Sequence, residues 1–232
     1  MICVMAGASM DAAPNRQLTA VLFDLDGVLI DSHQQHEIAW EKWAQELGKS
    51  LPEGFFKRSF GMRNESIIPD LLGWEKDSIE VARLAFRKEE IFRLELKQVG
   101  LIPLPGVITL LTALKDAGIP AAVASSTPRE NLTTVMAMTG LGMYFQAMIS
   151  GSDVTHGKPH PEVFLRAAAA LHAAPQNCLV IEDAHVGIDA GLAAGCRVLA
   201  VATTHPLESL SAAHHAAPDL THVTIHELMR LF

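Results

Sequence analysis

The stretch DLDGVLIDS, residues 24–32, constrains the fold of this chain more than any other segment. It follows an apolar run, TAVLF at residues 19–23, that predicts a buried β-strand. Asp24 and Asp26 stand at alternate positions, so both carboxylates are expected to leave the strand end on one side. Two neighbouring carboxylates repel each other unless a cation or a shared proton relieves them. A plain turn rich in Asp and Gly is the simpler interpretation, and the rest of the chain must decide between the two.

Composition and charge exclude several classes of protein. The chain has 232 residues and a formal net charge of −8, with no block of Lys or Arg, so no nucleic-acid partner is expected. No apolar run approaches the roughly 20 residues of a membrane-spanning helix, so no membrane partner is expected. Cys3, Cys178 and Cys196 show no close pairing, which indicates reduced thiols and a cytoplasmic location. We expect residues 1–18 to form a flexible tail rather than a signal peptide.

The spacing of apolar residues and the capping signals in residues 34–103 predict a small unit made only of helices. Asn64 is expected to cap a short helix that Pro69 disturbs. Ser78 is expected to cap a long helix that ends at Gly100. The turn-rich segment that follows marks the end of this unit.

Beyond this unit, strands and helices alternate, and this predicts an α/β fold with a doubly wound parallel sheet. Strands are predicted at residues 19–23, 119–124, 147–150, 178–181, 196–201 and 222–223. Thr127 is expected to cap the helix after the second strand, and His214 and His215 are interpreted as part of a surface segment. We therefore expect a catalytic core from residues 19–33 and 104–232, interrupted by a helical cap at residues 34–103.

Polar residues follow several of the predicted strands, at the edge where an open parallel sheet binds its ligands. They are, in chain order, Asp24 and Asp26, then Ser125 and Ser126, then Lys158 in the frame GKPHP, then Glu182 and Asp183. Hard oxygen ligands from two carboxylates and a backbone carbonyl suit Mg²⁺. Hydroxyls, amides and a lysine can bind phosphate and balance its charge. A second acid can serve as general acid and then as base.

These residues resemble the motifs of the haloacid dehalogenase superfamily. DLDGVLIDS is similar to its first motif, DxDGV/TxxDS, and Ser125 in VASST to its second. Lys158 in GKPHP is similar to the third, and Glu182-Asp183 in VIEDAHVGIDAGLAAG to the fourth. The four motifs occur in the right order over nearly the whole chain past Thr19, which makes the pattern specific.

The resemblance implies a role for each of these residues. Asp24 would be the nucleophile that forms an aspartyl-phosphate, and Asp26 the acid and base. Mg²⁺ would lie on Asp24, the carbonyl of Asp26, and Asp183, with Glu182 behind these ligands. Ser125, Ser126 and Lys158 would bind the phosphate. The dehalogenases proper lack the second Asp, so phosphoryl transfer is expected rather than dehalogenation.

The helical cap resembles that of the beta-phosphoglucomutase-like branch. Arg63 in FGMRNES falls where that branch places a substrate-holding arginine, and Lys88 occupies a similar late position. His36 and Trp40 lie one helical turn apart, so His36 can face the cleft while Trp40 packs nearby. Core packing of Trp40 and a solvated position for Lys88 remain the alternative interpretations.

We therefore expect a Mg²⁺-dependent phosphatase of small phosphorylated metabolites, with sugar phosphates as substrates and a monomeric chain. The alternative is a phosphomutase of the beta-phosphoglucomutase type, which uses the same intermediate but returns the phosphoryl group to a sugar. The cap residues favour the mutase, and the loop STPREN after Ser125 favours the phosphatase. A receiver-type signalling module also carries acids at strand ends, but it would be shorter and would lack the helical insert.

Overall fold

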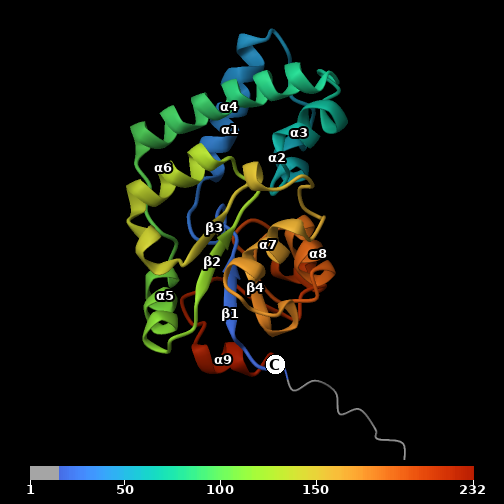
Figure 1. Ribbon diagram of the computed structural model, residues 1–232. Coiled ribbons are helices and arrows are strands. Elements are labelled where there is room, and N and C mark those ends of the chain that lie inside the picture. The colour runs from blue at the N-terminus through green and yellow to red at the C-terminus, as the bar shows by residue number, and fades with distance from the viewer. Residues whose placement is uncertain (1–15) are drawn as a thin grey trace, which may run out of the picture.

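The structure, a computed structural model, describes residues 16–232 and has two parts, one above the other (Figure 1). The lower part is a parallel β-sheet with helices on both faces, and a group of helices stands above the carboxyl ends of the strands. The predicted tail, residues 1–18, lies mostly outside the described residues, as does Cys3. Among the helices of residues 16–232, none combines the length and the apolar character needed to span a membrane.

The sheet has six parallel strands in the order β3-β2-β1-β4-β5-β6. The strands are β1 (Ala20–Phe23), β2 (Ala121–Ala124), β3 (Ala147–Ile149), β4 (Cys178–Glu182), β5 (Arg197–Val201) and β6 (His215–Ala217). The direction of the strand order reverses between β1 and β4, and in a doubly wound sheet the ligand crevice lies beyond the carboxyl ends at that point. The predicted fold class is confirmed.

The prediction misplaced the last strand. β6 pairs with residues Leu199 to Val201 of β5, whereas residues 222–223 lie in a turn and a loop. His214 and His215 are exposed, as predicted, although His215 begins β6 and Nδ1 of His214 accepts from the backbone N–H of Val198 at 3.1 Å. β6 has only three residues and pairs on one side, so its sequence carries no clear alternation of apolar and polar residues.

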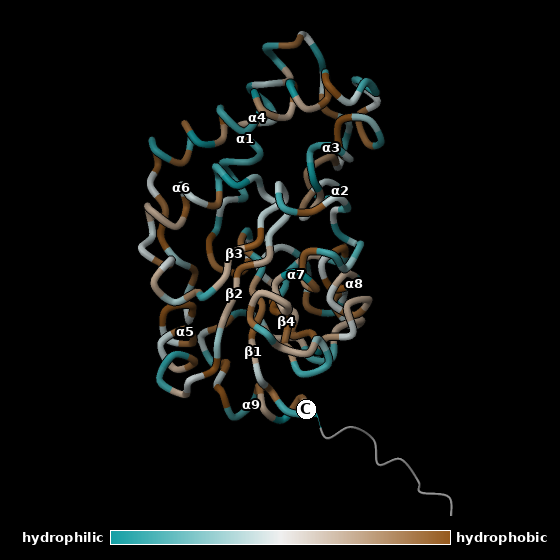
Figure 2. Tube along the Cα trace, in the orientation of Figure 1, coloured by the Kyte–Doolittle hydropathy of each residue, from teal (hydrophilic) through white to brown (hydrophobic). Residues whose placement is uncertain are grey.

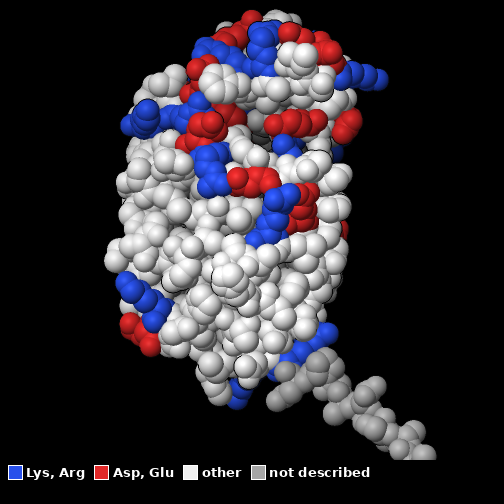
Figure 3. Space-filling view, in the orientation of Figure 1, with Lys and Arg blue, Asp and Glu red and all other residues white. Residues whose placement is uncertain are grey.

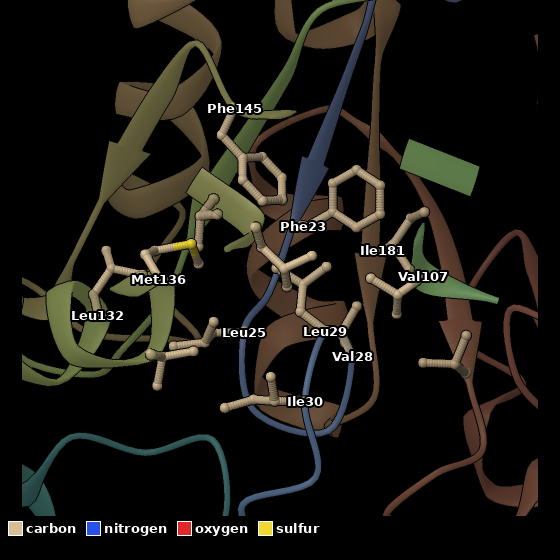
Figure 4. Packing of buried hydrophobic residues seen from close by; sticks show 14 of the residues in the cluster. Phe23, Leu25, Val28, Leu29, Ile30, Val107, Leu132, Met136, Phe145 and Ile181 are labelled. Atoms are coloured by element: carbon tan, nitrogen blue, oxygen red, sulfur yellow. The ribbon is translucent and has the colours of Figure 1, made fainter. Parts of the chain in front are cut away.

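Alternating side chains divide the core into two layers. In β1, Val21 and Phe23 belong to one apolar cluster, while Ala20 and Leu22 belong to the other. Figure 4 shows the first layer, in which the ring of Phe23 meets that of Phe145 edge-on at 5.9 Å between centroids. The helices α5 (Val107–Asp116), α6 (Arg129–Thr139) and α9 (Ile225–Met229) cover this layer, and α7 (Glu162–Ala170) and α8 (His185–Ala193) cover the other.

The upper part consists of helices that we call the cap helices. They are α1 (His33–Glu46), α2 (Phe55–Ser59), α3 (Asn64–Ser66), the π-helical turn η1 (Ile67–Leu71) and α4 (Ser78–Val99). Hydrophobic and hydrophilic residues alternate along α1 and α4, as expected for helices buried on one face (Figure 2). On the face shown in Figure 3, charged side chains of both signs gather over the cap helices and the upper edge of the core, and they are sparse over the lower part of the core.

The chain enters and leaves the cap helices at the same place. Ile30 and Pro103 form an antiparallel bridge, and the N–H of Leu104 donates to the carbonyl of Leu29 at 3.0 Å. The two connections therefore run side by side. The geometry suits a two-stranded hinge between the cap helices and the sheet.

Three predicted helix caps are wrong. Asp77, not Ser78, caps α4, since its carboxylate accepts from the N–H groups of the second and third helical residues. Asn64 is the first residue of α3 and its side chain makes no cap bond. Pro128 occupies the N-cap position of α6, so Thr127 lies one residue outside it. Pro69 falls inside η1, where the ring widens the helical turn because it lacks an N–H and crowds the preceding carbonyl.

Candidate active site

Three buried carboxylates meet where the strand order reverses. Asp24 follows β1 directly, Glu182 is the last residue of β4, and Asp183 comes next. One oxygen from each of the three lies within 4.8 Å of the others. Their exposed fractions are 6% or less, so water does little to screen their mutual repulsion.

The ammonium of Lys158 lies between two of these carboxylates. Its Nζ is 2.5 Å from Oδ1 of Asp24 and 2.6 Å from Oε1 of Glu182, and the ring of Phe164 lies beneath it at 4.9 Å. Burial alone lowers the pKa of Lys158, but the charges of Asp24 and Glu182 outweigh it and raise that pKa above its ordinary value. Lys158 is therefore a permanent cation at this site.

One ammonium does not balance three carboxylates. Burial, against the opposing charge of Lys158, raises the pKa of Asp24 to about 7. Burial and the charges of Glu182 and Asp24 likewise raise the pKa of Asp183 well above its usual range. A divalent cation would supply the missing charge, and oxygen donors of this kind are those that hard cations prefer. The donor set therefore fits a divalent metal.

Both carboxylate oxygens of Glu182 already accept hydrogen bonds from other groups of the protein. Its Oε1 holds Lys158, and its Oε2 accepts from the N–H groups of Asp183 and Ala184 at 2.8 and 2.9 Å. Gly187 of α8 lies so close that a Cβ there would come within 1.7 Å of Oε1. This placement suits a residue that orients Lys158 and the turn of Asp183 from behind.

The loop after β5 contributes two threonines that the sequence analysis missed. Thr204 donates its hydroxyl to Oδ2 of Asp183, and Thr203 donates its hydroxyl to the carbonyl of Gly27. Both follow the fifth strand at its carboxyl end, the same edge that supplies the carboxylates. Because their place directly after a predicted strand can be read from the sequence, it could have identified both threonines as candidate site residues.

Hydroxyl groups line the side of the cleft that follows β2. Ser125 is 1% exposed, and its Oγ accepts from the N–H of Thr127 at 3.1 Å. The buried Oγ of Ser126 has no hydrogen-bond partner, a condition shared by only one other buried side-chain atom in residues 16–232. Both serines line the cleft together with Asp24 and Asp26. A buried hydroxyl without a partner is costly unless a ligand pairs with it.

Asp26 faces the cap helices. The hydroxyl of Ser32 donates to its Oδ1 at 2.5 Å, and Nε2 of His36 lies 3.7 Å from the same oxygen. Burial alone raises the pKa of Asp26, but His36, the Ser32 hydroxyl and the charge of Lys88 together lower it below its ordinary value. Asp26 and Asp24 are thus held in opposite electrostatic environments. Such a pair is suited to two different chemical roles.

Lys88 is buried and fixes the tautomer of His36. Its side chain is 2% exposed, which excludes the solvated alternative, and Nζ lies 2.7 Å from Nδ1 of His36. An ammonium can only donate, so Nδ1 accepts and the ring proton lies on Nε2, toward Asp26. The rings of Trp40 and Phe92 each lie 5.2 Å from Nζ. Trp40 thus both packs in the cap helices and contacts the buried cation.

Arg63 crosses from the cap helices to the core. Its Nη1 donates to the carbonyls of Val154 and Thr155 at 3.2 and 3.4 Å, and its Nε lies 3.3 Å from Glu65. It also lines the cleft. The cavity beneath the cap helices measures about 80 Å³, room for a few water molecules. The cap helices thus lie directly over the cleft that the carboxylates and hydroxyls line.

A doubly wound sheet that gathers acids, hydroxyls and a buried lysine beneath a helical cap defines a class of hydrolase. The chain belongs to the haloacid dehalogenase-like hydrolases, and the model of that family matches residues 18–195. The match includes all four of the sequence motifs, so the resemblance read from them is confirmed.

The relatives of the chain agree with this class. It is 35% identical over 213 residues to 5-amino-6-(5-phospho-D-ribitylamino)uracil phosphatase, chloroplastic, of Arabidopsis thaliana, covering 90% of this chain but only 57% of that protein. It is 34% identical to hexitol phosphatase A of Escherichia coli (strain K12), covering 86% and 92% of the two chains. The crystal structure of beta-phosphoglucomutase from Clostridium difficile superposes with a TM-score of 0.83 at 26% identity, covering 92% and 96%. The predicted beta-phosphoglucomutase-like branch is confirmed.

Proposed function

We propose that this protein is a Mg²⁺-dependent phosphatase of small phosphorylated metabolites, with sugar phosphates as its substrates and an aspartyl-phosphate on Asp24 as its intermediate. The observation that carries the proposal is the excess of buried carboxylate over ammonium at Asp24, Glu182 and Asp183. Membership of a hydrolase family, with relatives named as phosphatases, supports phosphoric monoester hydrolysis as the reaction.

The nucleophile would be the oxygen of Asp24 that Lys158 does not hold. Lys158 fixes Oδ1, which leaves Oδ2 to attack phosphorus and form the aspartyl-phosphate. Mg²⁺, bound by Asp24, Asp183 and the carbonyl of Asp26, would keep Asp24 ionised and offset the charge of the phosphate oxygens. The hydroxyls of Ser125 and Ser126 would donate to the phosphate from the opposite wall.

Asp26 would transfer the protons. It would first donate to the leaving oxygen and then, as a carboxylate, take a proton from the water that attacks the aspartyl-phosphate. Its surroundings favour the carboxylate in the absence of substrate. An arriving phosphate dianion opposes that charge and favours the protonated form that the first step needs.

Replacing Asp24 tests this assignment. Asp24→Asn should reduce phosphate release from p-nitrophenyl phosphate in Mg²⁺ by at least ~1000-fold, because the amide is not a nucleophile. Asp116→Asn, an exposed acid at the end of α5 and outside all four motifs, is the matched control and should keep its rate. Retained activity in Asp24→Asn would refute the proposed nucleophile.

A phosphomutase remains the second candidate, because Arg63, Lys88 and His36 all line the cleft and lie on the cap helices. Such residues can hold a second phosphate or a sugar hydroxyl in place of water. The two functions separate when the protein is given β-glucose 1-phosphate and a bisphosphate primer. A phosphatase releases inorganic phosphate faster than it forms glucose 6-phosphate, and the opposite order would establish the mutase.

Access and setting form the remaining part of the proposal. We infer that residues 34–103 move as one cap about the paired connections at Ile30 and Pro103, since the cap helices lie over the cleft and both connections run side by side. Cys178 and Cys196 are buried and unpaired, which supports a reducing, cytoplasmic setting. A monomer is sufficient for this chemistry, because one chain supplies every group named above.

A further inference from the structure

Asn131 is a fully buried amide that joins the core to the cap helices. It lies on α6, and its exposed fraction is 0%. Its Nδ2 donates to Oε2 of Glu89 on α4 at 2.5 Å, and its Oδ1 accepts from Nη1 of Arg93 on α4 at 2.8 Å. Nδ2 also lies 3.3 Å from the hydroxyl of Thr127. One side chain therefore meets both an acceptor and a donor of the same cap helix.

The carboxylate of Glu89 is buried and accepts hydrogen bonds from several other side chains besides Asn131. Its other oxygen, Oε1, accepts from Nζ of Lys88 at 2.9 Å and from Nδ2 of Asn64 at 2.6 Å. Burial alone raises the pKa of Glu89, but Lys88, His36 and Asn64 together lower it, so it stays a carboxylate. Neither Glu89 nor Asn131 belongs to the four sequence motifs.

These contacts form a chain of polar groups that runs from one wall of the cleft to the other. It begins at Ser125, passes through Thr127 to Asn131, and crosses to the cap helices at Glu89. From Glu89 it continues through Lys88 to His36, and Nε2 of His36 lies 3.7 Å from Oδ1 of Asp26 in the core, an electrostatic contact longer than a hydrogen bond. Two of these contacts, Asn131 to Glu89 and His36 to Asp26, join the cap helices to the core, so both require the cap helices to lie against it.

We propose that Asn131 is a positioning residue for proton transfer: by docking on Glu89 it sets the closed cap in the register at which Lys88 turns His36 toward Asp26. This inference deepens the proposed function and rests on it. The side-chain amide of Asn131 can donate to the carboxylate of Glu89 and accept from the guanidinium of Arg93 at the same time. A carboxylate there would face Glu89 with like charge, and the cap helix would have to withdraw.

The decisive measurement is the dependence of kcat/KM on the leaving group. This constant reports only the steps up to departure of the alcohol, so hydrolysis of the common aspartyl-phosphate does not enter it. Substituted phenyl phosphates of graded leaving-group pKa share one shape and differ in their need for a proton. Asn131→Asp should lower kcat/KM for phenyl phosphate at least ~10-fold more than for p-nitrophenyl phosphate, because general acid catalysis contributes about 100-fold or more.

A double substitution separates this role from damage to folding. In Glu89→Gln with Asn131→Asp, donor and acceptor exchange places: the new amide group donates to the new carboxylate, while the remaining carbonyl oxygen still accepts from Lys88 and Asn64. The total charge is unchanged. The double variant should therefore recover most of the loss on phenyl phosphate, and Thr133→Ala on the exposed side of α6 should lose nothing. The proposal would be overturned if Asn131→Asp lowered kcat/KM equally for both phosphates, or did not lower it at all. It would also be overturned if the double variant did not recover kcat/KM for phenyl phosphate.

A second readout does not depend on turnover. The ring nitrogen signals of His36, assigned by their absence in His36→Gln, should show a proton on Nε2 in the unsubstituted protein and should change in Asn131→Asp but not in Thr133→Ala. Unchanged signals would also refute the role of Asn131. An unsubstituted protein that releases no phosphate from any substrate would instead refute the proposed function.

Discussion

At the scale of single residues, Gly27 shows how closely the site is built. It follows Asp26 with a φ of +80°, a backbone conformation that side chains disfavour. A Cβ at this position would lie 2.0 Å from Oδ2 of Asp183 and 2.8 Å from the hydroxyl of Thr204. Glycine is therefore needed here for two reasons: the backbone has a positive φ, and the carboxylate of Asp183 lies where a Cβ would stand.

Gly27→Ala should cost about 3 kcal/mol of unfolding free energy, from a strained backbone and a collision with a buried side chain. It should also abolish any rise in melting temperature on adding Mg²⁺, because the methyl group displaces Asp183. Gly48→Ala is the matched control, since Gly48 has a φ of +62° and nothing within 4 Å of the added carbon. That variant should cost only about 1 kcal/mol and keep the response to Mg²⁺. A normal Mg²⁺ response in Gly27→Ala would contradict the proposed metal position.

The residues that sequence reasoning found and missed differ in a physical way. Asp24, Lys158 and Asp183 stand beside strand ends or in a constrained Pro frame, so a one-dimensional pattern already places them at one edge of a sheet. Glu89 and Asn131 stand inside helices, where a polar residue usually faces water. They are buried where α4 docks against α6, and that contact depends on how the cap helices return to the core.

At the scale of elements, the start of α6 is fastened to the segment after β3. The carboxylate of Asp153 accepts from the N–H and the hydroxyl of Ser150 at 2.7 and 2.6 Å and pairs with Arg129, the first residue of α6. This arrangement holds Gly151 against the carbonyl of Ser126, beside the proposed phosphate site. Burial alone raises the pKa of Asp153, but Arg129 and Ser150 lower it to about 2.

The contribution of Asp153 to stability should depend on pH. Its ordinary pKa is 3.8, so the stabilisation is complete above about pH 5 and is lost as the pH falls toward 2. The shift corresponds to ~2.5 kcal/mol, and screening at a side chain that is 30% exposed reduces this to about 1 kcal/mol. Asp153→Asn should therefore cost about 1 kcal/mol in urea unfolding at pH 7 and little near pH 2. Most of that cost should vanish in an Arg129→Met background, and a pH-independent cost would contradict the ion pair.

Element boundaries were predicted less well than element types, and the reasons are local. Asp77 and Ser78 are both good capping residues, and the choice between them depends on which backbone N–H groups lie within reach. The helix after β2 was expected to begin at Thr127, but the side chain of Thr127 turns to Asn131. The strand His215–Ala217 exists because β5 offers a free edge, and nothing in its own three residues demands it.

At the scale of the whole molecule, all three tryptophans lie in the upper part. Trp40 and Trp43 are on α1, and Trp74 packs on Trp43 at 5.3 Å between ring centroids. The apolar cluster that contains Trp40 also contains Phe23 and Val123 of the sheet, together with Leu25, Val28 and Leu29, which follow β1. Tryptophan fluorescence thus reports on the cap helices alone, while far-ultraviolet circular dichroism reports on every helix and strand.

Because the cluster is continuous, the two probes should report one cooperative transition. Urea unfolding curves followed by fluorescence and by circular dichroism should share a midpoint and a slope. Leu29→Ala, which opens a cavity in this cluster, should lower the free energy of unfolding by about 2–5 kcal/mol. Both midpoints should therefore move to lower urea concentration together. A fluorescence midpoint well below that of circular dichroism would show that the cap helices unfold separately.

The paired connections at Ile30 and Pro103 also bear on how the chain folds. β1 must find β2 across a long loop, and closing a long loop costs entropy before the strands can pair. The contacts between α1 and α4 are made within that loop. If the cap helices assemble early, they hold Ile30 close to Pro103, and the search that remains covers only the short segment from there to β2. The insert that closes the active site would then also speed the pairing of the two central strands.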